Sequence, residues 1–172
     1  IDHSDKYDVT KRGLNMTEGN FMTSSTRDRI MKDIRELEAK KSAISDRIGE
    51  ARMQGGLEEN EELLMALEDM QRHDQEANRY QEMLFDAKII QPIKLGKKKN
   101  VSVGTTVTIM NTDNDQEHVW TLLGVHDSDP NNGIISMKSP MGKELLTREV
   151  GDEIEVNGTY YEILKITAKK FN

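Results

Sequence analysis

Residues 24–90 read SSTRDRIMKDIRELEAKKSAISDRIGEARMQGGLEENEELLMALEDMQRHDQEANRYQEMLFDAKII, and this stretch decides the fold. It has no proline, and most of its residues are good helix formers. Two sets of residues recur at intervals of three or four, and they are apolar except for Lys41 in the first set and His73 in the second. The apolar members are Ile30, Ile34, Leu37, Ile44, Ile48 and Ala51, then Leu63, Ala66, Met70, Ala77, Tyr80, Leu84 and Ala87. This spacing is typical of a coiled-coil seam. We therefore expect two long helices.

The two apolar sets are mirror images about position 57, and Gly55-Gly56 separates them. Two successive glycines disfavour a continuous helix. Ile48 and Ala66 lie the same number of residues from position 57. In an antiparallel hairpin such residues face each other. Lys41 and His73 occupy equivalent polar positions, and we expect them to share one polar layer. The pattern predicts an antiparallel coiled-coil hairpin.

The sequence after Gln91-Pro92 changes to short β-like runs at 101–110, 118–125, 134–137, 153–156 and 160–166. Asn157-Gly158 favours a type I′ turn between the last two runs. Residues 141–146, after Ser139-Pro140, favour a short helix. The predicted fold class is α+β, with a hairpin followed by a small antiparallel β-domain. Its expected core is Val107, Ile109, Trp120, Leu122, Ile135, Leu145, Ile154, Tyr161 and Ile163.

These patterns predict four segments. Residues 1–23 form a polar N-terminal arm, residues 24–90 the hairpin, residues 91–100 a linker and residues 101–172 the β-domain.

Composition excludes several classes of protein. The 172 residues are 35% hydrophobic and 32% charged, with a net charge of −7, so a surface that coats nucleic acid is not expected. There is no cysteine, which excludes disulfides and thiolate metal sites. No apolar run approaches the roughly 18 residues of a membrane span. We expect a soluble cytoplasmic monomer without a membrane partner.

The residues that carry chemistry are few. No nucleophile–base set or phosphate-binding loop occurs, and the four histidines are scattered rather than placed at metal-ligand spacing. We expect no permanently bound metal and no catalysis by the chain itself. Residues 24–54 hold eight basic residues against six acids, whereas residues 57–90 hold three against ten. The basic arm is either a solvated face or a stripe that contacts RNA or an acidic channel.

Four carboxylates crowd the turn between the predicted helices: Glu58, Glu59, Glu61 and Glu62. Acidic residues in the first turn of a helix complement its dipole, and that explains all four without a function. Alternatively, the turn presents a carboxylate to a metal that a partner holds, because Mg²⁺ takes only one or two protein carboxylates besides water.

Four motifs, in order, resemble those of bacterial transcript cleavage factors of the Gre family. Residues 48–60, IGEARMQGGLEEN, resemble the family's hairpin tip, and residues 103–108, VGTTVT, its first β-domain strand. Residues 135–146, ISMKSPMGKELL, and 150–156, VGDEIEV, resemble two further β-domain segments. The resemblance implies a C-terminal domain similar to an FKBP-type fold. It also implies that this domain docks at the secondary channel of a bacterial-type RNA polymerase while the hairpin reaches the active centre.

The resemblance also implies roles for individual residues. The tip carboxylates Glu59 and Glu58 would help to hold a Mg²⁺ ion shared with the polymerase, which then cleaves its own backtracked RNA. Basic residues of the first arm would contact the nascent RNA 3′ end or the channel wall: Arg47, Arg52, Lys40 and Lys41. The docking segment would be Ser139, Pro140, Met141 and Gly142.

One departure keeps three functions open. The family has an aspartate before the tip leucine, and this chain has Gly56. The chain is therefore a cleavage factor that uses Glu59 with Glu58, or a channel binder that regulates the polymerase without efficient cleavage. The third possibility is a coiled-coil adaptor unrelated to transcription.

Overall fold

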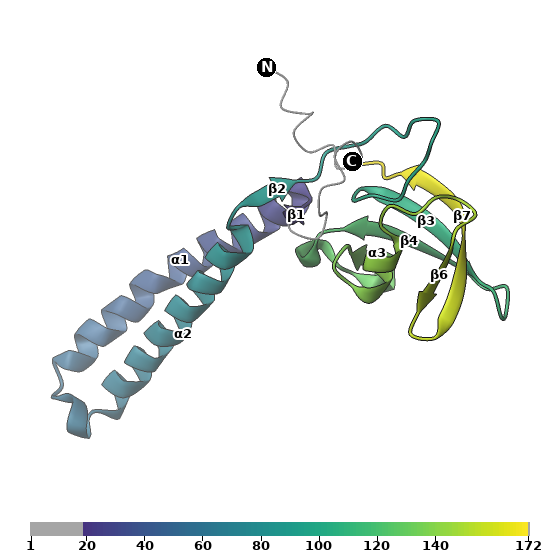
Figure 1. Cartoon of the computed structure of the whole chain (residues 1–172). Coiled ribbons are helices and arrows are strands. Elements are labelled where there is room, and N and C mark those ends of the chain that lie inside the picture. The colour runs from purple at the N-terminus through teal and green to yellow at the C-terminus, as the bar shows by residue number, and fades with distance from the viewer. Residues whose placement is uncertain (1–18, 172) are drawn as a thin grey trace, which may run out of the picture. The chain divides into compact units, whose positions relative to one another are not determined.

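Figure 1 shows the computed structural model, which describes residues 19–171. The chain divides into two compact units. One consists of residues 27–85, and the other joins the described residues before 27 to those after 85. The expected polar arm falls mostly on residues 1–18, which lie outside the described part.

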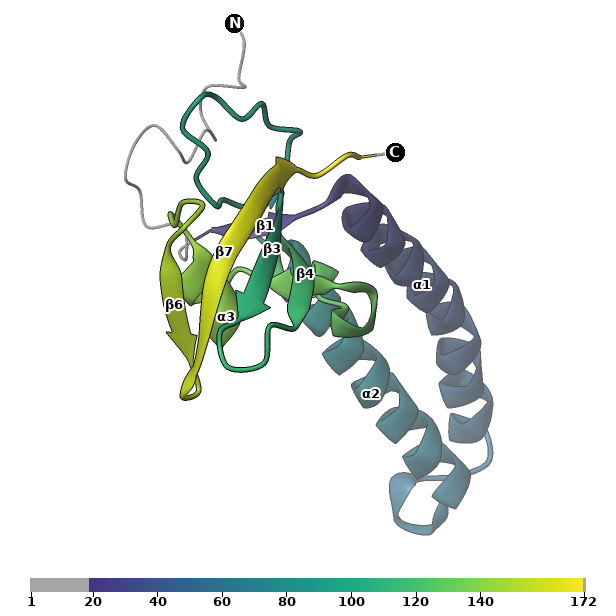
Figure 2. The same cartoon turned by 90° about the vertical axis from the view of Figure 1, so that its right-hand side faces the viewer.

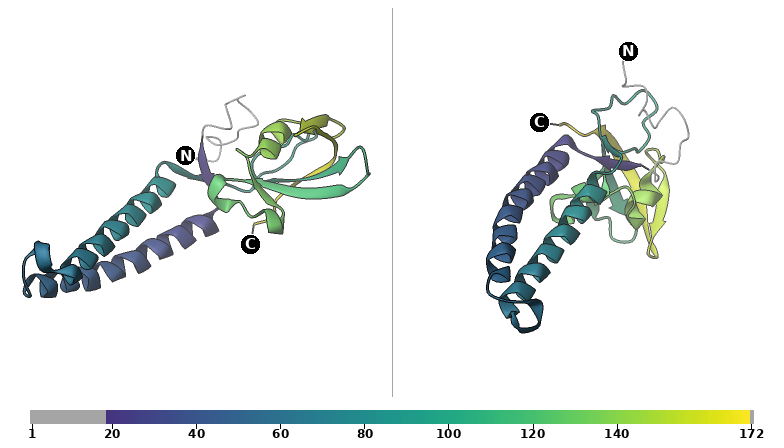
Figure 3. Two further views of the ribbon diagram at one scale, coloured as in Figure 1. Left: turned by 90° about the horizontal axis from the view of Figure 1, so that it is seen from below. Right: turned by 90° about the vertical axis from the view of Figure 1, so that its left-hand side faces the viewer.

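The hairpin consists of helices α1 (Ser24–Arg52) and α2 (Glu61–Leu84), joined through a short 3-10 turn, η2 (Leu57–Glu59). The helices lie side by side in all views (Figures 1 and 3), as the mirrored apolar pattern predicts. Leu37, Ala51, Leu63 and Ala66 are buried. With 29 residues, α1 is about 43 Å long. Helix α2 ends earlier than the predicted boundary at residue 90.

His73 and Lys41 do not form the expected polar layer. His73 is buried, and its Nε2–H donates to the Leu37 carbonyl oxygen at 2.9 Å. Its Nδ1 lies 3.3 Å from an Asp74 carboxylate oxygen. Lys41 is exposed. A backbone carbonyl thus satisfies the buried ring, because burial of an unpaired polar group is costly.

Two three-residue strands flank the hairpin in sequence. Strand β1 (Asn20–Met22) pairs in parallel with β2 (Ala87–Ile89), with Asn20 opposite Ala87. The Ile90 amide extends the pairing by donating to the Met22 carbonyl at 2.8 Å. The sequence division placed these residues in the polar arm and in the hairpin. Strands this short show too little alternation to predict.

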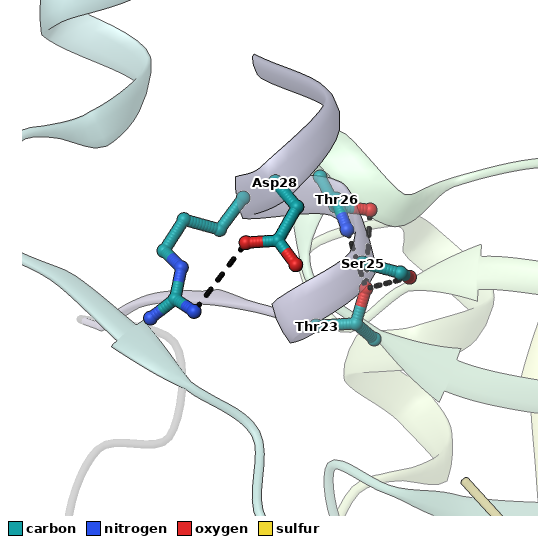
Figure 4. Close-up of polar contacts among 5 residues, drawn as sticks. Thr23, Ser25, Thr26 and Asp28 are labelled. Atoms are coloured by element: carbon teal, nitrogen blue, oxygen red, sulfur yellow. Dashed lines mark hydrogen bonds and ion pairs between the residues drawn. The ribbon is translucent and has the colours of Figure 1, made fainter. Parts of the chain in front are cut away.

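Thr23 is the N-cap of α1. Its hydroxyl accepts from the Thr26 amide at 3.2 Å and contacts the Thr26 and Ser25 hydroxyls (Figure 4). Figure 4 also shows the adjacent Arg27–Asp28 pair. The Thr23 hydroxyl and amide donate to the buried carboxylate of Asp127, at 2.7 Å and 3.1 Å. Asp127 also accepts from the Gly124 amide at 3.0 Å. Asp127 therefore holds Thr23 next to η3 within one compact unit.

The β-domain contains a five-stranded sheet in the order β5-β4-β3-β7-β6. Figure 2 shows β4, β3, β7 and β6 next to one another in this order. The pairs of the sheet are antiparallel except β4 with β5, which is parallel. The strands are β3 (Thr105–Asn111), β4 (Glu117–Leu123), β5 (Ile134–Ser136), β6 (Glu153–Val156) and β7 (Thr159–Ala168). Helix α3 (Pro140–Leu145) follows β5, and the 3-10 turns η3 (Val125–Asp127) and η4 (Pro130–Asn132) precede it. The α+β class is confirmed.

The core matches most of the predicted set. Seven of the nine predicted core residues are buried, whereas Trp120 and Tyr161 are half-buried against the same cluster. The type I′ turn is confirmed, since Asn157 and Gly158 both have positive φ, 52° and 80°. Within residues 19–171, no helix is long and apolar enough to cross a membrane.

We predict that Asp127→Ala destabilises the β-domain by about 2–4 kcal/mol, because it leaves the Thr23 and Gly124 amides buried without an acceptor. Urea unfolding followed by the fluorescence of Trp120, the only tryptophan, measures the change. The control is Asp129→Ala, which removes one exposed hydrogen bond to Asn132. Equal stability losses in the two variants would refute the role of Asp127.

Candidate functional site

Two successive glycines at the tip of the hairpin have different backbone conformations. Gly55 has φ of +142°, a conformation that side chains strongly disfavour. Gly56 has φ of −77° and ψ of 172°, which any residue adopts. A Cβ built at Gly56 has no neighbouring atom within 4 Å. The turn therefore requires glycine at position 55 but tolerates an aspartate at position 56.

The tip carboxylates are exposed. Glu58 and Glu59 lie in η2, and within the described chain neither side chain makes a hydrogen bond or an ion pair. Glu61 and Glu62 begin α2, where carboxylates favour the helix N-terminus. The side chains of Glu58, Glu59, Asn60, Glu61 and Leu64 line a shallow hollow of about 180 Å³. Two unpaired carboxylates are therefore available to a partner.

The carboxylates do not form a metal site by themselves. No group of three or more histidine or acidic side chains in residues 19–171 is arranged to hold a metal ion. Glu58 and Glu59 can supply one or two oxygen ligands, which fits a Mg²⁺ ion that keeps its remaining ligands from water and another molecule.

The predicted basic residues are not equivalent. Arg47 donates to the Asp69 carboxylate across the hairpin at 2.7 Å, and Arg72 pairs with the same carboxylate from its own helix. Arg52, the last residue of α1, is exposed, as is Lys41. Lys40 is also exposed and lines a hollow with Glu36, Glu76 and Tyr80. Arg47 therefore has a structural partner.

The predicted docking segment forms the beginning of α3. Ser139 caps the helix by accepting from the Gly142 amide at 3.1 Å, and its hydroxyl donates to the Ser136 carbonyl at 2.6 Å. Pro140 is the first helical residue. A Cβ at Gly142 would lie 2.2 Å from the Ser136 carbonyl oxygen, so only glycine fits. Met141 packs against the core. These residues stabilise the fold, and their role in docking stays a prediction.

Two contact residues were not assigned from the sequence. Asn60 is the N-cap of α2, and its side chain accepts from the Leu63 amide at 3.0 Å. An asparagine directly before an acidic first turn is a signal that could have identified this cap. Asp69 gave no such signal, because one acid among ten in its segment does not reveal a cross-helix partner.

Comparison with known families matches both units. Residues 20–89 match the family described as "Transcription elongation factor, N-terminal", and residues 96–168 match "Transcription elongation factor, GreA/GreB, C-term". These two matches, which together cover most of the chain, define its class, that of transcription elongation factors.

Individual relatives agree. The transcription elongation factor GreA of Helicobacter hepaticus is 36% identical over 143 residues, which cover 81% of this chain and 86% of the relative. GreA of Helicobacter pylori strain Shi470 is 34% identical over 148 residues, or 83% and 90% of the two chains. The crystal structure of Gfh1 from Thermus thermophilus aligns with a TM-score of 0.39 at 16% identity, over 88% of this chain and all of that one. The chain belongs to the GreA/GreB family.

We predict that Asp69 makes hairpin stability depend on pH. Two hydrogen bonds, the first and larger cause from Arg47 and the second from Arg72, hold the pKa of the Asp69 carboxyl below its ordinary value of 3.8. A lowered pKa contributes stability above the unfolded value, and this contribution is lost as the pH falls through the folded value. Asp69→Asn should therefore lower the melting temperature at pH 7, and the difference should shrink towards zero at about pH 2.

Circular dichroism at 222 nm measures both melting temperatures. Asp46→Asn, at an exposed position of α1, is the control and should show no such convergence. A difference between Asp69→Asn and the unaltered protein that stays constant with pH would contradict the prediction.

Proposed function

We propose that this chain binds bacterial-type RNA polymerase at its secondary channel and stimulates cleavage of backtracked RNA. In this proposal the hairpin enters the channel and its tip reaches the active centre. The chain acts as a monomer and as an accessory factor, so the bond-breaking chemistry belongs to the polymerase. Membership of a family of transcription elongation factors supports the proposal.

The observation that carries the proposal is the pair of unpaired carboxylates, Glu58 and Glu59, at the closed end of the hairpin. Exposed carboxylates are common, but here both belong to a three-residue turn between two helix ends. The seam between the helices holds that turn, which limits where the carboxylates can lie. A fixed pair of this kind is suited to completing the coordination of an ion that another protein binds.

Glu59, at the position of the family's glutamate, would be the main ligand, and Glu58 would assist it. A second Mg²⁺ supplies a stabilised hydroxide and charge neutralisation in phosphodiester cleavage. The chain's carboxylates would orient that ion and accept a hydrogen bond from the attacking water. Arg52 would contact RNA phosphates near the 3′ end, because its guanidinium is exposed at the end of α1.

Gly56 favours a second candidate function. Without the aspartate, the tip lacks one ligand that the family pattern includes, and a chain with poor cleavage would still occupy the channel. Such a chain would inhibit or regulate the polymerase by occupancy. The conformation of Gly56 makes the two functions separable, since it allows the aspartate to be restored without disturbing the turn.

A transcript cleavage assay on a backtracked complex with labelled RNA tests the proposal. Glu59→Ala should reduce the cleavage rate by about 10- to 100-fold, the usual effect of losing a group that tunes a metal site. Affinity for the polymerase should stay within twofold. The matched control is Glu62→Ala, which removes an equally exposed carboxylate from the first turn of α2. Unchanged cleavage by Glu59→Ala would remove Glu59 from the site.

Gly56→Asp distinguishes the two candidate functions in the same assay. Cleavage by the unaltered protein supports a working cleavage factor. Cleavage only after Gly56→Asp supports a regulator that acts by occupancy. If neither protein cleaves or binds core polymerase, both candidate functions are wrong and the adaptor remains.

Arg52 and Arg47 should differ in their effects. Arg52→Ala should slow cleavage with little change in melting temperature, because its side chain is exposed at the end of α1. Arg47→Ala should lower the melting temperature, because it breaks the bridge to Asp69. Cleavage kinetics and thermal melting of both variants check this, and the opposite pattern would assign RNA contact to Arg47.

A further inference from the structure

One amide side chain joins both arms of the hairpin at the tip. Asn60 Nδ2 donates to the Ala51 carbonyl oxygen at 2.6 Å and to the Gly55 carbonyl oxygen at 3.2 Å. Its Oδ1 accepts from the Leu63 amide at 3.0 Å. The three partners belong to the last turn of α1, to the glycine turn and to the first turn of α2. No other side chain in residues 19–171 bonds to all three segments.

These bonds add to the pairing that the backbone provides. The Ala51 carbonyl also accepts from the Gln54 amide at 3.1 Å, so the Asn60 side chain is its second donor. The last carbonyls of a helix and its first amides have no partner within that helix. Ala51 lies in the last turn of α1, and Leu63 is the third residue of α2. Asn60 therefore acts as an N-cap for α2 and supplies a donor to the end of α1. An N-cap aspartate has no donor, and a serine has one hydroxyl proton on a side chain one bond shorter, so neither replaces the two N–H groups of the Asn60 amide.

We propose that Asn60 is a positioning residue that fixes the tip carboxylates. Glu59 is bonded covalently to Asn60, and Glu58 lies in the same three-residue turn, η2. Gly55 and Gly56 directly precede η2, and their missing side chains leave the backbone free to move. The Asn60 amide binds the Gly55 carbonyl and the Ala51 carbonyl at the end of α1. These bonds restrict the backbone of the turn to one conformation.

Two variants separate this role from simple capping. Asn60→Ser keeps an oxygen that can accept from the Leu63 amide but has no amide donor. Asn60→Asp keeps the shape and the acceptor and loses the donor as well. The matched control is Asn78→Ser, which makes the same change at an exposed position in α2.

The first readout requires no polymerase. Backbone ¹⁵N order parameters of the full chain should fall below about 0.6 at Gly55, Gly56 and Glu59 in both Asn60 variants. The Leu63 amide should keep its protection from hydrogen exchange, and Asn78→Ser should leave the tip unchanged. If the tip amides of Asn60→Ser stay as ordered as in the unaltered protein, the inference is overturned.

The second readout rests on the proposed function. The maximal cleavage rate should fall at least fivefold in both Asn60 variants, while the concentration that gives half of this rate stays within twofold. Asn60→Ser and Asn60→Asp should behave alike, since both lose the amide N–H groups although they differ in charge. A rise in the half-maximal concentration with an unchanged maximal rate would assign Asn60 to binding and overturn the positioning role.

The two readouts fail separately. If neither the unaltered protein nor Gly56→Asp supports cleavage, the proposed function fails, and the order parameters still decide whether Asn60 holds the tip. If cleavage is present and the tip amides do not respond to Asn60→Ser, the proposed function stands and the inference about Asn60 fails.

Discussion

The apolar seam between α1 and α2 is the contact on which the tip depends. Most of the stability of helices in proteins comes from the packing of an amphipathic face, so the burial of α1 and α2 against each other maintains both. Ala51 and Leu63 are buried where the seam approaches the turn, and Ala66 is buried one turn further along. Between the end of α1 at Arg52 and the beginning of α2 at Glu61 the chain has only eight positions, 53 to 60, in which to reverse. The seam therefore confines the turn and its carboxylates to the end of the hairpin.

Polar side chains add hydrogen bonds to the apolar packing of the hairpin. The buried imidazole of His73 donates to the Leu37 carbonyl, and Arg47 reaches Asp69 across the helices. Asn60 then satisfies the helix ends at the turn. Directly before α1, Thr23 donates to Asp127, and both residues belong to the unit that contains the β-domain. Polar side chains thus make hydrogen bonds at both ends of α1, and apolar side chains pack along the helix between them.

The sequence allowed much of the fold to be predicted because two periodic signals were strong. The mirrored spacing of three and four residues predicted the helical hairpin. Asn157-Gly158 predicted the turn between β6 and β7 in the β-domain. Contacts between residues far apart in the chain could not be predicted. Thr23 and Asp127 are 104 residues apart, and no local pattern relates them. The candidate site divides in the same way: Glu58 and Glu59 were predicted from local motif and charge, whereas the bonds of Asn60 depend on where Ala51 lies.

The central claim is that the tip reaches the active centre of RNA polymerase. The chain has no cysteine, so Met53→Cys, at a position 90% exposed beside the turn, would carry a single tethered iron chelate. In complex with core polymerase, hydroxyl radicals from that chelate should cut the polymerase chains around the catalytic metal. The same chelate on Tyr160→Cys, in the β-domain, should not cut there. Cuts confined to the polymerase exterior, or no cuts above background, would contradict the account.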